Sequence, residues 1–512
     1  MILIVDFGAQ YAQLIRRAVN DLGAQAHVVD AATVSVQPPV GTAGVILSGG
    51  PASVHPDALN LTQRILSWKT PVLGICFGHQ LLAAIAGGTV AQQVSREYGR
   101  ANFRVTRSSP LTTGLPLHRL YHVWMSHGDS ITSLPVGAWV SIGETDHGRH
   151  AAIANETARL YGVQFHPEVT QTECGLYILR NFVTDICRSP RDFTAQDLVQ
   201  EISDRIRKHV VGTDHILVAG SLGVDSTTVA TLCARALGQE RVHTVFVDNG
   251  LHREEDLELA TTAHAFLPNL IIEHTEDLFL DALEGISDGQ EKRRMIGTTF
   301  WKVFQAVAER LGARFPIAAF TQGTLAPDVI ESGASSTGSD LIKIHHNLVS
   351  PPPTFPFPPF EPLRILYKDQ VRALGRAIGV PDRILSRHPF PGPGLAIRVD
   401  GPVTRERVRI ARACDAIFMR RLKDGGYYDA VSQALVVVQQ GSPVCVQGDA
   451  RTRGCPVQLR AFTTRDFMTA DVALLFTGFL AEVSDEIMNS VKGVGNVNYN
   501  TTRKPPGTIE WE

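Results

Sequence analysis

Short apolar runs alternate with longer amphipathic stretches along the first 185 residues. The apolar runs cover residues 1–6, 45–47, 71–75 and 159–165. Their length and β-branched content are typical of buried strands, and the amphipathic stretches between them favour helices. Such regular alternation predicts a mostly parallel sheet with helices on its faces.

The same alternation begins again after a polar link at residues 188–197. This link contains a proline, and its Thr194 is suited to cap the following helix. Apolar runs at residues 215–219 and 242–248 predict the strands of a second α/β unit. The proline-rich stretches at residues 351–359 and 388–394 interrupt the pattern, because proline removes a backbone donor and restricts its neighbour.

The pattern therefore divides the chain into three predicted domains, 1–187, 188–386 and 387–512. The fold class is α/β: two parallel-sheet α/β domains, followed by a C-terminal α+β domain of mixed helix and strand. A chain of 512 residues suits this division, because domains commonly have about 100–200 residues.

Composition narrows the environment and the partners. Lys and Arg number 48 against 51 Asp and Glu, a net charge of −3, so we expect no general nucleic-acid binder. No apolar run approaches the roughly 18 residues of a membrane span, and the N-terminus resembles a first strand and not a signal peptide. The seven cysteines are scattered without a C-x-x-C pair, which favours a reducing, cytoplasmic location.

One cysteine lies where a predicted strand meets a predicted helix. The stretch G-I-C-F-G-H-Q, residues 74–80, places glycines on both sides of Cys76. Glycines permit a tight turn around a strained residue, and a helix N-terminus favours a thiolate. Downstream, His166 and Glu168 are two residues apart after a strand and can share one face. His166 is then a candidate base for Cys76, and Glu168 is its orienting partner.

Two backbone groups complete this candidate site. The N–H groups of Gly50, in S-G-G-P at residues 48–51, and of Phe77 are candidate oxyanion donors. An isolated cysteine and a distant histidine are more often structural than catalytic. The turn, the glycine-rich stretch and H-P-E occur together, however, and they resemble the class I glutamine amidotransferases. That resemblance implies hydrolysis of glutamine through a glutamyl thioester, with Cys76 as nucleophile. Purine-biosynthetic members usually have C-Y-G-M-Q where this chain has C-F-G-H-Q.

A second candidate site lies at residues 221–226, S-L-G-V-D-S, between a predicted strand and a predicted helix. A tight loop at this position points N–H groups at an anion, and Asp225 suits Mg²⁺ directly or through water. Small-residue turns are common, so the shape alone also fits an ordinary turn. The segment resembles the S-G-G-V-D-S loop of the ATP pyrophosphatases at five of six positions. The resemblance implies an ATP site with the following residues: Ser221, Gly223, Val224, Asp225, Ser226 and Val247.

Leu222 replaces a glycine of that loop. A leucine keeps its N–H group for phosphate, but it does not easily adopt a positive φ and its side chain needs space. Two outcomes are therefore open. Either the loop accepts a β or α conformation at this position, or phosphate binding is impaired.

Further stretches extend the resemblance over essentially the whole chain. They include D-N-G-L at residues 248–251, I-K-I-H-H-N at 342–347, R-H-P-F-P-G-P-G-L at 387–395 and K-P-P-G-T-I-E-W-E at 504–512. In this order they resemble the family of glutamine-hydrolysing GMP synthases. The family implies an amidotransferase, an ATP pyrophosphatase and a C-terminal dimerisation domain that also binds XMP, hence a homodimer. It implies that ATP adenylates O2 of XMP and that ammonia then displaces AMP.

The same resemblance suggests further binding residues. Those expected to hold XMP are Arg293, Lys504, Thr508, Ile509 and Glu510. Those expected in a mobile lid over ATP are Lys343, His345, His346 and Asn347. Taken singly, each also fits an ordinary surface or packing role.

Departures from the family concentrate around ATP and the lid. Leu222 is one, and the proline run at 351–359 replaces a glycine-rich hinge, which stiffens the lid. Three hypotheses therefore stand. The first is a GMP synthase. The second is a divergent paralogue that aminates a purine-nucleotide analogue in specialised metabolism. The third is a nucleotide-binding protein with an inactive ATP domain.

Overall fold

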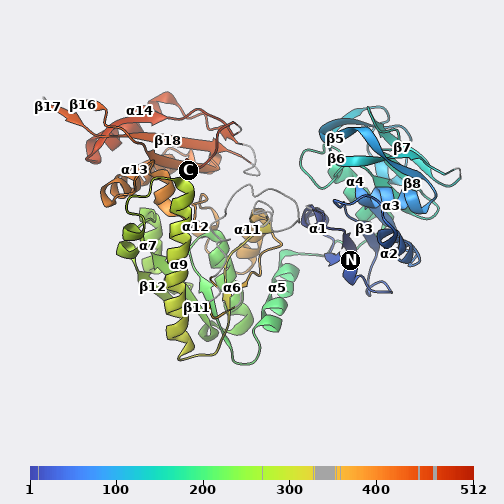
Figure 1. Cartoon of the computed structure of the whole chain (residues 1–512), viewed down its shortest axis with the longest axis horizontal. Coiled ribbons are helices and arrows are strands. Elements are labelled where there is room, and N and C mark those ends of the chain that lie inside the picture. The colour runs from blue at the N-terminus through green and yellow to red at the C-terminus, as the bar shows by residue number, and fades with distance from the viewer. Residues whose placement is uncertain are drawn as a thin grey trace. The chain divides into compact units, whose positions relative to one another are not determined.

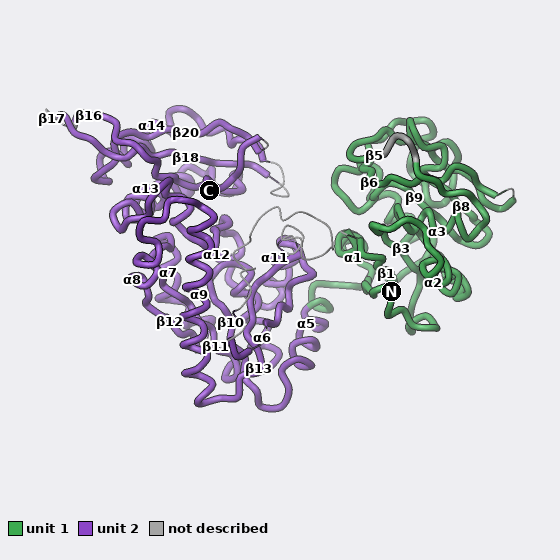
Figure 2. The backbone as a smooth tube through the Cα atoms, in the orientation of Figure 1, with its two compact units in different colours: residues 1–198, 333–340 green, residues 199–332, 341–512 purple. Residues whose placement is uncertain are grey.

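The computed structural model describes residues 1–512 except 10, 136, 268, 327, 329–351, 353–354, 358, 448–449, 465–469 and 505, and the side chains of 93–96, 447 and 450. Its described residues form two compact units, residues 1–198 and residues 199 onward (Figure 2). No helix in the described part of the chain is long and apolar enough to cross a membrane.

The first unit is built on a nine-stranded sheet of order β2-β1-β3-β4-β9-β8-β7-β5-β6. Its strands are β1 Ile2–Asp6, β2 Ala26–Asp30, β3 Gly44–Leu47, β4 Val72–Ile75, β5 Thr89–Val105, β6 Leu120–Ser133, β7 Val140–Thr145, β8 Ala152–Asn155 and β9 Leu160–Val163. The pairs from β2 to β9 are parallel, and those from β9 to β6 are antiparallel. The strands predicted from the apolar runs are present, and an antiparallel extension adjoins them.

Alternate side chains of the parallel strands enter different cores. Ile2 and Ile4 of β1 pack with residues of α1 (Ala12–Asp21) and α4 (Gly175–Arg180). Leu3 and Val5 pack in a second cluster with residues of α2 (Pro56–Leu66) and α3 (Phe77–Ile85). The period of two along a strand thus gives the sheet two buried faces, each covered by helices (Figure 1).

The second unit contains a parallel sheet of order β12-β11-β10-β13-β14. Its strands are β10 His215–Ala219, β11 Val242–Asp248, β12 Leu270–His274, β13 Ile317–Thr321 and β14 Pro359–Phe360. The helices that precede or connect them are α5 Ala195–His209, α6 Val224–Leu237, α7 Glu254–Thr262, α8 Glu276–Ala282 and α9 Gly289–Gly312. The predicted cap of α5 is confirmed, because the Asp197 N–H donates to Thr194 Oγ1 at 3.4 Å.

The C-terminal part adds α11 Lys368–Ala377, α12 Asp382–Leu385, α13 Arg405–Asp424 and α14 Thr477–Ser490. It also adds strands, which are β15 Gln433–Val438, β16 Val444–Gln447, β17 Ala450–Arg453, β18 Cys455–Thr463, β19 Asp471–Val472 and β20 Val494–Tyr499. One hydrophobic core joins Leu217 and Val245 of the parallel sheet to α13 and β15, which explains why residues 199 onward form a single unit. The fold is thus α/β with a C-terminal α+β portion.

Candidate active sites

Cys76 lies in a strained turn between β4 and α3. Its φ is +52°, in the left-handed region that is costly for a residue with a side chain. Its N–H donates to the Val163 carbonyl at 2.9 Å. A Cβ added to Gly74 would lie 2.4 Å from the Gly78 carbonyl oxygen, so the turn needs glycine there. The glycines flanking the cysteine therefore permit the close turn that the sequence suggested.

His166 and Glu168 form a buried hydrogen-bonded pair. His166 Nδ1 lies 2.7 Å from Glu168 Oε1, and the Thr172 hydroxyl donates to the His166 carbonyl at 2.6 Å. Burial lowers the pKa of His166, but the Glu168 carboxylate and a hydrogen bond with Cys76 outweigh burial and raise that pKa to about 10. His166 thus lies between the thiol and the carboxylate, as a base between a nucleophile and an orienting group requires.

Two further groups contact the Cys76 sulfur. Gln164 Nε2 donates to it at 3.7 Å, and the thiol lies 3.7 Å from the Ser126 carbonyl oxygen. Gln80 Nε2 in turn donates to Gln164 Oε1 at 3.3 Å. Sequence reasoning missed Gln164, which directly follows β9 and lies two positions before His166.

The glycine-rich stretch after β3 lies beside this site. The Gly78 N–H donates to the Ser48 carbonyl at 3.1 Å. A Cβ on Gly49 would lie 3.3 Å from His166 Cε1, and one on Gly50 would lie 3.2 Å from Phe77 Cδ1. Phe77 is the first residue of α3, and the first N–H groups of a helix have no partner within it. The two candidate oxyanion residues, Gly50 and Phe77, are therefore neighbours next to the nucleophile.

The second candidate site is a closed loop between β10 and α6. The Ser221 N–H donates to Ser226 Oγ at 3.1 Å, and the two hydroxyl oxygens are 3.0 Å apart. Gly223 and Val224 follow at the start of α6, where Gly223 occupies the N-cap. A Cβ on Gly323 would lie 3.0 Å from the Ser226 backbone nitrogen, so the loop after β13 packs directly against this one.

Leu222 adopts neither the β nor the α conformation that the first of the two open outcomes required. Its φ is +56°, in the left-handed region, and its side chain is fully buried. The left-handed conformation costs about 1–2 kcal/mol for a residue with a side chain. Burial of a leucine side chain contributes about 1.5–3 kcal/mol, which offsets that cost. The loop therefore keeps the backbone form that glycine would give it.

Asp225 offers a carboxylate oxygen suited to a hard cation. Among the described residues, the buried Asp225 Oδ1 has no hydrogen-bond partner, and Oδ2 accepts from Lys368 Nζ at 2.6 Å. Within the described residues, no group of three His, Cys, Asp or Glu side chains is placed to hold a metal. One free carboxylate oxygen beside a phosphate loop fits Mg²⁺, because this ion commonly binds one or two carboxylates and substrate phosphates. Lys368 has no signal in the sequence that would have marked it.

Among the remaining candidate ATP-site residues, the structure describes Val247 but not the predicted lid. Val247 is buried near the end of β11, and its carbonyl lies 2.9 Å from His252 Nε2. The predicted lid residues lie outside the described residues, namely Lys343, His345, His346 and Asn347.

The expected XMP residues occupy different environments. Arg293 on α9 is buried and donates to the Glu512 backbone oxygen. Thr508 is exposed, and its hydroxyl donates to the Glu510 carbonyl at 2.5 Å. Lys504 is partly buried and forms a backbone bridge with Ala470. The structure thus brings the C-terminal segment against α9 and the sheet containing β18.

Ile509 and Glu510 are tied into the protein interior. Ile509 packs with Leu435 and Val437 of β15. Glu510 Oε1 and Oε2 accept from Arg398 at 2.8 and 3.0 Å. Burial raises the pKa of Glu510, but Arg398 outweighs burial and lowers that pKa below its ordinary value. Glu510 is therefore a charged, bidentately held carboxylate.

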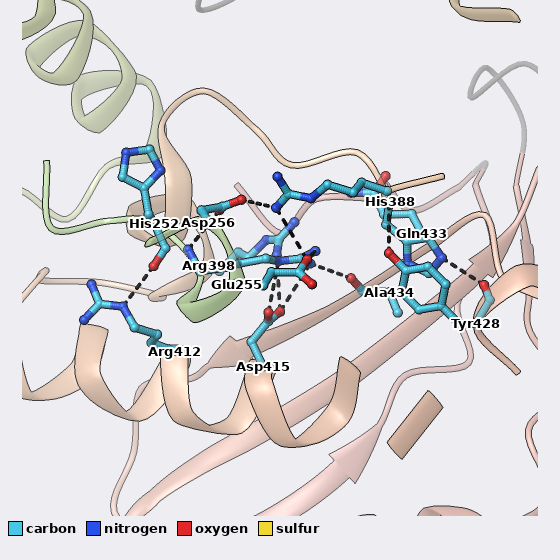
Figure 3. A network of polar contacts seen from close by, with 12 residues as sticks. His252, Glu255, Asp256, His388, Arg398, Arg412, Asp415, Tyr428, Gln433 and Ala434 are labelled. Carbon is cyan, nitrogen blue, oxygen red and sulfur yellow. Dashed lines mark hydrogen bonds and ion pairs between the residues drawn. The ribbon is translucent and has the colours of Figure 1, made fainter. Parts of the chain in front are cut away.

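Arg398 belongs to a larger polar network, part of which Figure 3 shows around α13. Arg398 Nη1 is 3.5 Å from Asp415, and Arg253 Nε is 3.0 Å from the same carboxylate. Arg387 pairs with Asp256 at the other end of the network. Sequence reasoning assigned no role to Arg387 or Arg398, because the buried carboxylates that pair with them are distant in the chain.

Comparison with protein families agrees with this organisation. The class-I glutamine amidotransferase model matches residues 3–186. The NAD synthase model matches residues 195–294, and the GMP synthase C terminal domain model matches residues 420–511.

Full-length relatives are similar along the whole chain. The protein named GMP synthase [glutamine-hydrolyzing] from Aquifex aeolicus is 42% identical over 516 residues, covering 100% of this chain and 99% of the relative. The protein of the same name from Vibrio campbellii is 44% identical and covers 100% and 98%. The one from Candida albicans is 42% identical and covers 100% and 97%.

The fold and the sites define a glutamine amidotransferase joined to an ATP-using α/β enzyme, a carbon–nitrogen ligase. The full-length similarity is specific to one such enzyme. The chain belongs to the glutamine-hydrolysing GMP synthase family.

Proposed function

We propose that this protein converts XMP to GMP, with glutamine as the nitrogen source and ATP as the activating substrate. The observation that carries the proposal is the presence in one chain of the Cys76–His166–Glu168 set and a separate phosphate-type loop. The full-length relatives favour this function over a purine-analogue paralogue or a protein with an inactive ATP domain.

In the first step, the Cys76 sulfur attacks the side-chain carbonyl carbon of glutamine. The N–H groups of Gly50 and Phe77 stabilise the oxyanion, and His166 gives a proton to the departing ammonia. Water then hydrolyses the thioester, with His166 as base, and releases glutamate. Glu168 keeps the imidazole oriented, which its 2.7 Å contact supports.

In the second step, O2 of XMP attacks the α-phosphorus of ATP and pyrophosphate leaves. Ammonia then adds to C2, and the C2–O2 bond breaks as AMP departs with that oxygen. The candidate loop Ser221, Gly223, Val224, Asp225 and Ser226 would hold the pyrophosphate portion of ATP, with Val247 near the nucleoside. Mg²⁺, when bound, would neutralise phosphate charge, and Asp225 Oδ1 is its candidate protein ligand.

Several finer assignments belong to the same proposal. Arg293, Lys504, Thr508, Ile509 and Glu510 would hold XMP. The chain would act as a cytoplasmic homodimer with domains at 1–187, 188–386 and 387–512. These assignments draw on the family resemblance and on the C-terminal segment that lies against α9.

Turnover of XMP with ATP and Mg²⁺ tests this function, once with glutamine and once with ammonium. GMP and AMP are separated by chromatography. With each nitrogen source, we expect one AMP for each GMP. Glutamate release without GMP or AMP would instead support an inactive ATP domain. Product from an XMP analogue alone would support the paralogue.

A further inference from the structure

Arg387 reaches the ATP loop from outside it. Its Nη1 donates to the Leu222 carbonyl oxygen at 3.2 Å, while its Nη2 pairs with Asp256 and lies 3.5 Å from Glu255. The side chain is 12% exposed. One guanidinium therefore connects the loop after β10 to the acidic start of α7.

This contact fixes one peptide plane of the loop. In a trans peptide, the carbonyl of one residue and the N–H of the next point in opposite directions. The Leu222 carbonyl points to Arg387, so the Gly223 N–H points the other way. There it donates to Ser221 Oγ at 3.4 Å. This hydrogen bond is longer than the roughly 2.7–3.2 Å usual for an N–H donor, so a phosphate oxygen can replace the hydroxyl as its acceptor.

The same contact acts on the strained residue. Leu222 holds a left-handed φ of +56°, a conformation that persists in a leucine only when its surroundings enforce it. Burial of the side chain is one such constraint, and the charged donor on its carbonyl is a second. A charge-assisted hydrogen bond is stronger than a neutral one, so it can hold a strained peptide in place.

We propose that Arg387 is a positioning residue of the ATP loop. It orients the Leu222–Gly223 peptide so that the Gly223 N–H faces the pyrophosphate portion of ATP, and it maintains the left-handed conformation of Leu222. The inference rests on the proposed function, since it assigns ATP to this loop. It adds a residue that touches no substrate.

This positioning role requires the two separate donor nitrogens of the guanidinium group. Asp256 is buried and also accepts from the Arg253 N–H at 3.1 Å, so its position is set by the start of α7. Arg387 spans the distance between that carboxylate and the loop carbonyl with two different nitrogens. A lysine in its place keeps the charge near Asp256 but has a single nitrogen for both partners.

Arg387→Lys is therefore the test, with Arg241→Lys as matched control. Arg241 is also partly buried and donates to a backbone carbonyl, that of Asp214, at 2.9 Å, but it lies before β11 and away from the loop. The readouts are KM for ATP, KM for XMP, kcat with ammonium, and glutaminase activity. Arg387→Lys is expected to raise KM for ATP about tenfold, the effect of losing one charged hydrogen bond, with little change in KM for XMP or in glutaminase activity. Arg241→Lys should change KM for ATP less than about twofold.

A second test repeats the Arg387→Lys substitution in the Leu222→Gly variant. Glycine adopts the left-handed conformation without strain, so the loop depends less on Arg387. In the Leu222→Gly background, Arg387→Lys should raise KM for ATP by only about threefold or less, which is non-additivity between contacting residues. An unchanged KM for ATP in Arg387→Lys, or an equal rise in both backgrounds, would overturn the inference. Failure of the proposed function is distinct, because the wild-type protein would then form no AMP.

Discussion

His166 Nδ1 lies 2.7 Å from Glu168 Oε1, and both side chains are almost wholly buried. The other side of the imidazole faces Cys76, which takes part in raising the pKa of His166. A single ring thus links a carboxylate to a thiol in a buried site. This arrangement supports one half of the proposed reaction without reference to the other.

The Cys76→Ala substitution separates glutamine hydrolysis from the amination of XMP. Loss of the sulfur removes the nucleophile, so glutamine-dependent GMP formation should fall by at least about 10³-fold, while ammonium-dependent formation persists. Parallel assays with each nitrogen source measure this. An equal loss of both activities would contradict the assigned role of Cys76.

Glu168→Gln should change how stability depends on pH. The pKa of His166, raised to about 10 in the folded protein, is ordinarily near 6.5. A raised pKa contributes stability that is fully present below about pH 6.5 and is lost as pH rises through about 10. The stability difference between wild type and Glu168→Gln should therefore shrink from pH 6.5 to pH 10. Denaturant unfolding at several pH values measures this difference, and a difference that grew with pH would count against the coupling.

Because His79 is buried, we expect the folded protein to lose stability as the pH falls. Burial lowers the pKa of His79 to about 3, so the folded ring is neutral above that pH, and its Nε2, 2.9 Å from the His150 carbonyl oxygen, carries the remaining proton and donates it. The unfolded state binds a proton below about pH 6.5 and the folded state does not. This one group should lower the free energy of unfolding by up to about 1.4 kcal/mol per pH unit between pH 6 and pH 4.

His79→Met removes that titration, and methionine is the residue that purine-biosynthetic relatives usually have at this position. The variant should lose less stability than wild type between pH 6 and pH 4, whatever its stability at pH 7. Thermal or denaturant unfolding of the two proteins at each pH gives the comparison. Identical slopes would show that His79 is protonated in the folded state.

Leu222→Gly and Leu222→Ala distinguish strain from packing. Both variants lose the buried side chain, but only alanine must still adopt a positive φ with a Cβ. Leu222→Gly should therefore be more stable than Leu222→Ala by about 1 kcal/mol, although alanine is ordinarily the more favourable residue. Denaturant midpoints of the two variants measure the difference. A more stable alanine variant would exclude a left-handed residue 222.

The sequence was sufficient for the parts of the fold that local pattern determines. The apolar runs predicted β1, β3, β4, β9, β10 and β11, because buried strands of parallel sheets are continuous and apolar. The sequence also marked Cys76 as a candidate, because the glycines on both sides of this cysteine indicate a tight turn. The antiparallel strands β5 to β8 were not anticipated, because a strand such as β6 alternates buried side chains with more exposed ones and so has no continuous apolar run.

The sequence did not predict the roles of residues that act through partners distant in the chain. Arg387 stands in a recognisable stretch, but nothing local indicates that it reaches the Leu222 carbonyl, 165 positions away. For Leu222 the sequence left two outcomes open, and local propensity made a positive φ unfavourable. Tertiary contacts, namely full burial and the Arg387 bond, override the propensity.

In the proposed reaction, ATP activates O2 of XMP before ammonia displaces AMP from C2. XMP labelled with oxygen-18 at O2 tests this order of steps, with ATP, Mg²⁺ and ammonium as the other reactants. Because the C2–O2 bond breaks as AMP leaves, the label should appear in the phosphate of AMP, one atom for each GMP formed. Label in water or pyrophosphate, with unlabelled AMP, would rule out adenylation at O2.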